Sequence, residues 1–92
     1  MEFDWDERKA EQNIAKHCAP FEHAARGFLD LCRLDAEDSR HNYGEERRLT
    51  LCRIEGRLYA VAYTVRGETI RLISARKANP RERRLYDQTL PA

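Results

Sequence analysis

The sequence predicts one α+β domain: two N-terminal helices, a small antiparallel sheet of three to four strands, and a C-terminal helix. Three observations lead to this prediction. Apolar residues recur at helical spacing over residues 10–28, they alternate over residues 47–75, and the connections at residues 55–57 and 66–68 are short. Connections of that length cannot cross over a sheet, so the joined strands must be antiparallel. A chain of 92 residues has room for one core, so we expect residues 1–92 to form a single domain.

The start of the chain predicts an extended segment followed by a helix. Residues 1–5, MEFDW, alternate apolar and polar side chains, which suits a short edge strand or an extended arm. A helix is expected to begin near Asp6 and end near His17, with Ile14 on its packed face. Cys18 follows at the position where glycine is favoured as a left-handed cap, so mild strain is expected there.

A second helix is expected from Pro20 to about Asp30. Proline suits the first turn of a helix because its missing N–H has no partner there in any case. A complete apolar stripe follows at helical spacing, formed by Phe21, Ala24, Ala25 and Phe28. This stripe indicates that one side of the helix is buried.

The middle of the chain predicts the strands. Residues 47–54 and 58–65 are the clearest, since β-branched and aromatic residues alternate with polar ones. Residues 69–75 add a third strand after a short turn, and residues 31–37 are a weaker candidate for a fourth. The three clear strands therefore predict an antiparallel meander.

The capping residues predict where the last helix begins. Asn79 suits the N-cap, Pro80 the first helical position and Glu82 the third position of a capping box. Leu85 is expected on the docked face. Tyr86 is expected to be about half exposed, where it could stack on a base or donate to a phosphate.

Positive charge is concentrated where the final strand meets this helix, because residues 70–86 hold five arginines and one lysine against one glutamate. Arg76 and Lys77 end the strand, and the free N–H groups of the helix would add to their positive potential, so a phosphate could be held there. The alternative is that Arg76 pairs with an acidic residue of the N-terminal half.

Strand alternation predicts that the side chains of the final strand form two sets on opposite faces. One set is Ile70, Leu72, Ser74 and Arg76, and the other is Arg71, Ile73, Ala75 and Lys77.

The net charge of +1 hides an asymmetry between the two halves of the chain. Residues 1–46 hold 6 Lys+Arg and 12 Asp+Glu, which sum to −6, whereas residues 47–92 hold 11 and 4, which sum to +7. Arginine grips phosphate with two parallel hydrogen bonds and stays charged. The basic half therefore indicates either a polyanionic or acidic partner, or a surface that complements the acidic half within the fold.

Several classes of site are disfavoured by the composition. The three cysteines form no C-x-x-C pair, so we expect neither a zinc site nor a disulfide framework, and no cofactor is expected. No apolar run approaches the roughly 20 residues that span a bilayer. The acidic first residues do not resemble an export signal, so the expected location is the cytoplasm, with no membrane partner.

His17 is one candidate for proton transfer. It is either a general acid or base, or a packed and hydrogen-bonded histidine near the end of a helix. Lys9, Asn13 and Lys16 form a polar stripe beside it, a pattern that is normally a solvated face. Ser74 lacks a G-x-S-x-G setting and is not expected to be a nucleophile.

Three segments carry a resemblance to a known family: WDERKAEQNIAKH, RHNYGEERRL and IRLISARKANPRERRLY. In this order and spacing they resemble the BrnT family of bacterial toxins, over roughly residues 2–87. One departure is Cys18, where the family usually has glycine after the Lys-His pair. The resemblance implies a RelE-like fold whose RNA-cutting surface lies on the exposed side of the sheet.

The resemblance also implies a ribonuclease toxin of a type II toxin–antitoxin pair, which inhibits translation and growth. The implied partners are a BrnA-type antitoxin, an RNA substrate with or without ribosomes, and operator DNA reached only through the antitoxin.

Metal-independent endoribonuclease activity would require side chains to supply a base, phosphate-binding cations and an acid. The phosphate-binding candidates are Arg66, Arg71 and Arg76, and those for proton transfer are His17, Lys77, Glu82 and Tyr86. Further substrate contacts are expected from Lys9, Lys16 and Arg81. The alternative function is a non-enzymatic binding module, or an inactive toxin homologue, that acts in a DNA-bound regulatory complex.

Overall fold

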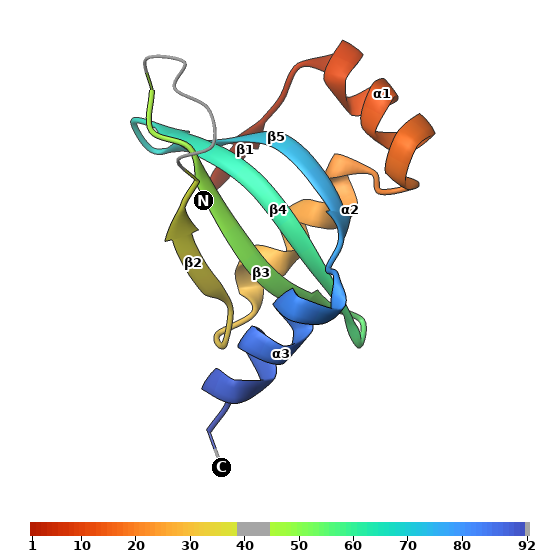
Figure 1. Ribbon diagram of the computed structural model, residues 1–92. Helices are drawn as coiled ribbons and strands as arrows, with labels where there is room; N and C mark the ends of the chain where they lie inside the picture. The colour runs from red at the N-terminus through yellow and green to blue at the C-terminus, as the bar shows by residue number, and fades with distance from the viewer. Residues whose placement is uncertain (39–44, 92) are drawn as a thin grey trace.

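The protein is described here by a computed structural model covering residues 1–38 and 45–91 (Figure 1). The first half of the RHNYGEERRL segment therefore lies outside the described residues. The predicted α+β class is confirmed. The elements are β1 (Glu2–Asp4), α1 (Glu7–His17), α2 (Phe21–Ala25), the 3₁₀ turn η1 (Arg26–Leu29), β2 (Leu34–Glu37), β3 (Arg48–Ile54), β4 (Arg57–Arg66), β5 (Thr69–Lys77) and α3 (Pro80–Thr89).

The sheet is larger than the sequence predicts. Its five strands lie in the order β1-β5-β4-β3-β2, and β1 pairs in parallel with β5, with Glu2 opposite Thr69. The prediction of three to four antiparallel strands is therefore wrong, and the sheet is mixed. The meander of β3, β4 and β5 is antiparallel as predicted. Local periodicity cannot reveal the pairing of β1, because this strand has three residues and its partner lies at the far end of the chain.

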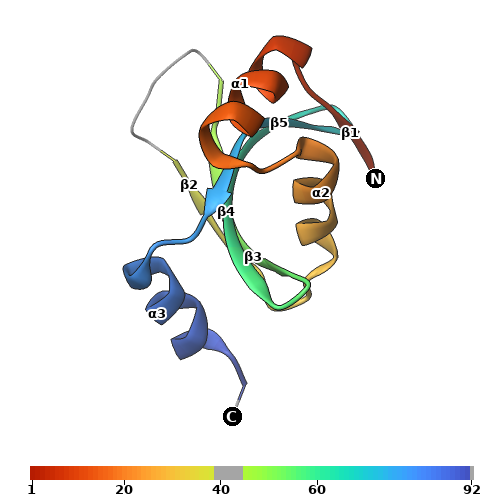
Figure 2. The same ribbon diagram turned by 90° about the vertical axis from the view of Figure 1, so that its right-hand side faces the viewer.

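The sheet separates two hydrophobic cores, with α2 on one side and α3 on the other (Figure 2). The α2 side holds the larger core, in which Phe21, Phe28 and Val61 are buried. The α3 side holds a smaller core around Leu51 and Tyr86. In the described part of the chain, no helix has the length and apolar character needed to cross a membrane.

A β-bulge in β5 changes which side chains share a face. Leu72 lies opposite Tyr63 but Ser74 lies opposite Ala62, so Ile73 has no partner in β4. Leu72 and Ala75 consequently enter the same core. The prediction that Leu72 shares a face with Ser74 and Arg76 is therefore wrong. Strict alternation fails because one extra residue reverses every orientation that follows it.

Helix α1 is held to the sheet by a polar residue. Asn13 is only 6% exposed, and its amide pairs with the backbone of Ala75 as a neighbouring strand would. Ile14, which the sequence predicts on the packed face, is 46% exposed. The helix ends at His17 as predicted, and Cys18 adopts the left-handed conformation with φ of 55°.

Candidate functional site

A cleft of about 290 Å³ lies between α1 and the bulged part of β5. We call it the α1 cleft. It brings three residues that the sequence singles out, Lys9, Lys16 and His17, to the same place. Its full lining is Lys9, Gln12, Asn13, Lys16 and His17 from α1, and Arg47, Ile73 and Ser74 from the sheet and the segment before β3.

The geometry of the cleft follows from how α1 is attached. Lys9, Asn13 and Lys16 recur at intervals of four and three, so they lie on one side of the helix. Because Asn13 is fixed to Ala75, the two lysines on its row are held beside β5. The bulge at Ile73 moves Ser74 away from the core that holds Ala75, so that its side chain reaches the cleft.

The α1 cleft is strongly positive. Lys9, Lys16 and Arg47 line it, and no Asp or Glu of the described residues does so. His17 adds a titratable imidazole. In a partly enclosed site of one sign of charge, the local potential favours anionic ligands. The arrangement can therefore bind a phosphate and supply a group for proton transfer.

Arg71 and Arg76, which the sequence predicts to bind phosphate, each form an ion pair with a carboxylate. Arg71 Nη1 lies 3.3 Å from Asp4 Oδ1. Arg76 donates to both carboxylate oxygens of Glu82, at 2.8 and 3.0 Å. The alternative expectation is that Arg76 pairs with an acidic residue of the N-terminal half. Arg76 is paired, but its partner Glu82 belongs to α3 in the C-terminal half, so this expectation is wrong about the location. Arg66 also has a carboxylate partner, Glu45, at 3.2 Å.

Two N–H groups at the N-terminus of α3, where the sequence suggests that a phosphate could bind, are already hydrogen-bonded. Asn79 Oδ1 accepts from the N–H of Glu82, and the Glu82 carboxylate accepts from the N–H of Asn79. Pro80 has no N–H to offer. The predicted capping box is present, and it places a carboxylate where an anionic ligand would have to bind.

Comparison of the chain with known protein families gives a match. The family described as "Ribonuclease toxin, BrnT, of type II toxin-antitoxin system" matches residues 5–82. The chain belongs to this family. The match covers α1, the meander and the first turn of α3, and thus the whole α1 cleft as described. No curated protein matches the chain. A type II toxin has an antitoxin as its partner, so this BrnT family member is one half of a pair.

Tyr86 of this BrnT chain is not half exposed as predicted. It is 2% exposed, and its hydroxyl donates to Asp30 Oδ2 at 2.7 Å. Burial, together with this hydrogen bond, raises the pKa of Tyr86. The ring belongs to the core between α3 and the sheet, with Leu51 and Leu58, so it is not available for stacking on a base.

Asp30 links three parts of the BrnT chain. Besides the Tyr86 hydroxyl, it accepts from the backbone N–H of Cys32 and of Arg53, both at 2.9 Å. Burial acts to raise the pKa of Asp30, but the hydrogen bonds from Tyr86 and the two N–H groups outweigh it and lower that pKa. The carboxylate is therefore charged and structural.

The remaining predicted residues lie elsewhere. Lys77 is exposed in a second hollow at the C-terminal end of β5, and Arg81 is exposed on α3. Sequence reasoning missed Arg47 and Asn13 as site residues. Asn13 shares the helical row of Lys9 and Lys16, so the signal was present but indicated a solvated face. In the described residues, no group of three or more His, Cys, Asp or Glu has the arrangement to hold a metal ion.

Proposed function

We propose that the protein is an endoribonuclease toxin that cleaves RNA in the α1 cleft. The observation that carries this proposal is the gathering of an imidazole and three cations in one cleft, with no carboxylate of residues 1–38 and 45–91 in its lining, in a chain of the BrnT family. Such a set of side chains has the components of phosphodiester cleavage by acid–base catalysis, without the assistance of a metal ion.

The proposed reaction is attack of a ribose 2′-OH on the adjacent phosphorus. His17 takes the 2′-OH proton, and the new P–O2′ bond forms as the P–O5′ bond breaks. Lys9, Lys16 and Arg47 stabilise the negative charge on the phosphoryl oxygens. One of the two lysine ammonium groups returns a proton to the leaving 5′ oxygen. The products are a 2′,3′-cyclic phosphate and a 5′-hydroxyl.

The remaining parts of the proposal come from the family. Helices before an antiparallel meander and a helix after it support a RelE-like fold, to which this chain adds the parallel strand β1. RNA cleavage would stop translation and growth in the cytoplasm. A BrnA-type antitoxin would neutralise the toxin and connect it to operator DNA. Arg66, Arg71, Arg76, Lys77 and Arg81 are proposed to assist RNA binding from outside the α1 cleft. Glu82 is proposed as a further candidate for proton transfer.

Purified protein incubated with RNA in EDTA, with and without ribosomes, tests the proposal. We expect the wild-type protein to cut RNA and His17→Gln to lower the rate by about 10²–10⁴-fold, the usual contribution of one general acid or base. Arg8→Gln is the control, because Arg8 is an exposed residue of α1 that does not line the cleft. Normal cutting by folded His17→Gln would refute the proposed mechanism.

The alternative, a non-enzymatic binding module or inactive homologue, is favoured by the carboxylate partners of Arg71 and Arg76. Under this alternative, expression of wild-type protein would leave growth unchanged, while the complex with its antitoxin would still form. Growth arrest by wild-type protein, relieved by His17→Gln and by the antitoxin, would exclude it.

A further inference from the structure

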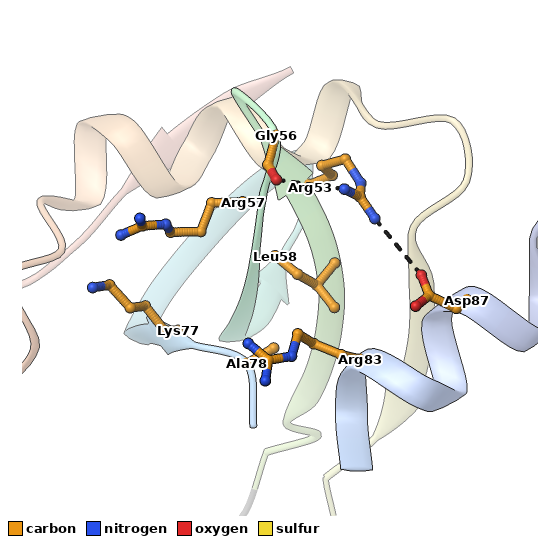
Figure 3. Close-up of a pocket in the computed structure, with 8 residues that line it drawn as sticks. All are labelled: Arg53, Gly56, Arg57, Leu58, Lys77, Ala78, Arg83 and Asp87. Atoms are coloured by element: carbon orange, nitrogen blue, oxygen red, sulfur yellow. Dashed lines mark hydrogen bonds and ion pairs between the residues drawn. The ribbon is translucent and has the colours of Figure 1, made fainter. Parts of the chain in front are cut away.

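A second cationic hollow lies at the C-terminal end of β5, where the β3–β4 hairpin meets the start of α3. We call it the hairpin hollow. It has a volume of about 550 Å³ and is lined by Arg53, Gly56, Arg57, Leu58, Lys77, Ala78, Arg83 and Asp87 (Figure 3). Four of these residues are cationic and one is anionic.

The single carboxylate of the hollow is already engaged. Arg53 Nη2 lies 3.7 Å from Asp87 Oδ1, and the Arg53 guanidinium also lies 5.2 Å from the ring centre of Tyr86. Arg53 therefore has a structural role, and it offsets the charge of Asp87. The positive charge of the other three residues remains unbalanced within the hollow.

Those three residues come from three different elements. Arg57 begins β4, Lys77 ends β5 and Arg83 belongs to α3. All three are exposed, and within residues 1–38 and 45–91 none of their side chains forms an ion pair or hydrogen bond. In Figure 3 the side chains of Arg57 and Lys77 run in the same direction, and Arg83 extends from α3 toward them.

Three like charges held together without a counter-charge repel one another, so the arrangement favours binding of a polyanion. The planar forks of two arginines match the oxygens of phosphate groups. The hollow also lies on the same strand as the α1 cleft. Ser74 and Lys77 are three residues apart on β5, about 10 Å along the strand, and their side chains point to opposite faces. Strand β1 pairs only with Thr69–Arg71, so an RNA segment can pass from one face to the other around the open edge of β5.

We infer that the hairpin hollow is a phosphate-binding subsite for single-stranded RNA, which holds the backbone beyond the nucleotides in the α1 cleft. The inference rests on the proposed function for its choice of RNA as the polyanion. Arg57, Lys77 and Arg83 contact phosphates and do not take part in the chemical step. Because they contact only the backbone, they add affinity without sequence preference.

The test uses a 2′-O-methyl oligoribonucleotide, which cannot be cut because its 2′ oxygen is blocked. Its Kd is measured over a range of salt concentrations for the full-length protein and for Arg57→Gln/Arg83→Gln. We expect the double substitution to raise Kd about tenfold at about 0.1 M salt. The slope of log K against log salt should fall by about 1.4, since each phosphate contact contributes about 0.7 on single strands.

The matched control is Arg8→Gln/Arg84→Gln, which removes the same charge from exposed positions outside both hollows. Equal effects of the two double variants would overturn the inference, since net charge alone would explain them. Lys77→Gln provides an independent single variant, expected to lower the slope by about 0.7. Unchanged oligonucleotide binding with weakened antitoxin binding would assign the hollow to an acidic protein segment and would also overturn it.

Failure of this inference is distinguishable from failure of the proposed function. If the oligonucleotide result is as expected but the wild-type protein cuts no RNA, the subsite stands and the ribonuclease proposal fails. If His17→Gln abolishes cutting while Arg57→Gln/Arg83→Gln binds the oligonucleotide like wild type, only the subsite is refuted.

Discussion

Helices α1 and α3 are attached to the sheet by different chemistry. The link from α1 is neutral: Asn13 Nδ2 donates to the carbonyl oxygens of Ala19 and Ala75, both at 2.8 Å, and Oδ1 accepts from the N–H of Ala75 at 3.1 Å. The links from α3 involve charged groups. Glu82 accepts from Arg76, and Tyr86 donates to the Asp30 carboxylate.

This difference determines which cations remain available to a ligand. Next to α1, attachment through an amide leaves Lys9 and Lys16 without ion pairs among the described residues. At α3, Arg76 forms two hydrogen bonds to Glu82 and is committed to holding the helix. The density of positive charge along the sequence is therefore a poor guide to the binding surface, since it does not distinguish structural arginines from free ones.

The largest expected effect on stability comes from breaking the neutral link. Asn13→Ala would leave the N–H and carbonyl of Ala75 and the carbonyl of Ala19 without their partner, and we expect a loss of about 3 kcal/mol in the free energy of unfolding. Urea denaturation measures this loss. Gln12→Ala, on the same helix but exposed, should change stability by less than about 0.5 kcal/mol. Similar losses for both would mean that α1 is held by its apolar contacts alone.

The next largest effect is expected at Asp30, and it depends on pH. The folded state lowers the pKa of Asp30 below its ordinary value of 3.8, so the ionised carboxylate stabilises the fold above that pH. This contribution is lost as pH falls through the lowered folded pKa. Asp30→Asn should therefore cost about 2 kcal/mol at pH 7 and much less at a pH near that lowered value.

Unfolding curves at neutral and acidic pH measure the difference between wild type and Asp30→Asn. Tyr86→Phe is the companion variant, because it removes one donor to the carboxylate and keeps the ring. If Asp30→Asn lowers the free energy of unfolding by the same amount at both values of pH, the structural role of the Asp30 charge is contradicted.

Glu82→Gln is expected to have a smaller effect on stability and to change the affinity for RNA. Glutamine preserves the capping box but removes the charge that faces Arg76, so stability should fall by about 1 kcal/mol. The released Arg76 guanidinium should bind the 2′-O-methyl oligonucleotide more tightly. If cleavage falls although binding tightens, Glu82 takes part in proton transfer. Arg76→Ala, by contrast, should lower both stability and toxicity if Arg76 contacts the substrate.

The smallest effect is expected at Arg71. Its 3.3 Å pair with the exposed Asp4 is of the surface type, so Arg71→Gln should change stability by less than about 1 kcal/mol. Thermal unfolding in low and high salt checks this, because a surface pair weakens as salt rises. A large loss would mean that the pair fixes β1 against β5 and that Arg71 belongs with the structural arginines.

Much of the fold could be predicted from local sequence signals. The start of α3 could be predicted from Asn79, Pro80 and Glu82. The strands β3, β4 and β5 could be predicted from the alternation of apolar and polar residues. The features that failed depend on distant contacts. The pairing of β1 with β5 joins opposite ends of the chain, and the bulge at Ile73 follows from the fit of β5 to β4.

The candidate site was predicted less well, for a related reason. The sequence places Lys9, Lys16 and His17 on one helix but cannot show that Asn13 turns this row toward β5. It also cannot show that Glu82 engages Arg76, because an arginine next to a helix start has the same local pattern whether it is paired or free. Burial of Tyr86 depends on where α3 crosses the sheet, which no local pattern records.

The bond between Asn13 and Ala75 joins residues that are 62 positions apart. A nascent chain therefore makes its first helix early but has no backbone on which to fix it until Ala75 has been synthesised. The α1 cleft, which needs that attachment to exist, would form only after Ala75 has emerged. If RNA is cut in this cleft, as proposed, a nascent chain cannot cut RNA before Ala75 has been synthesised and bonded to Asn13.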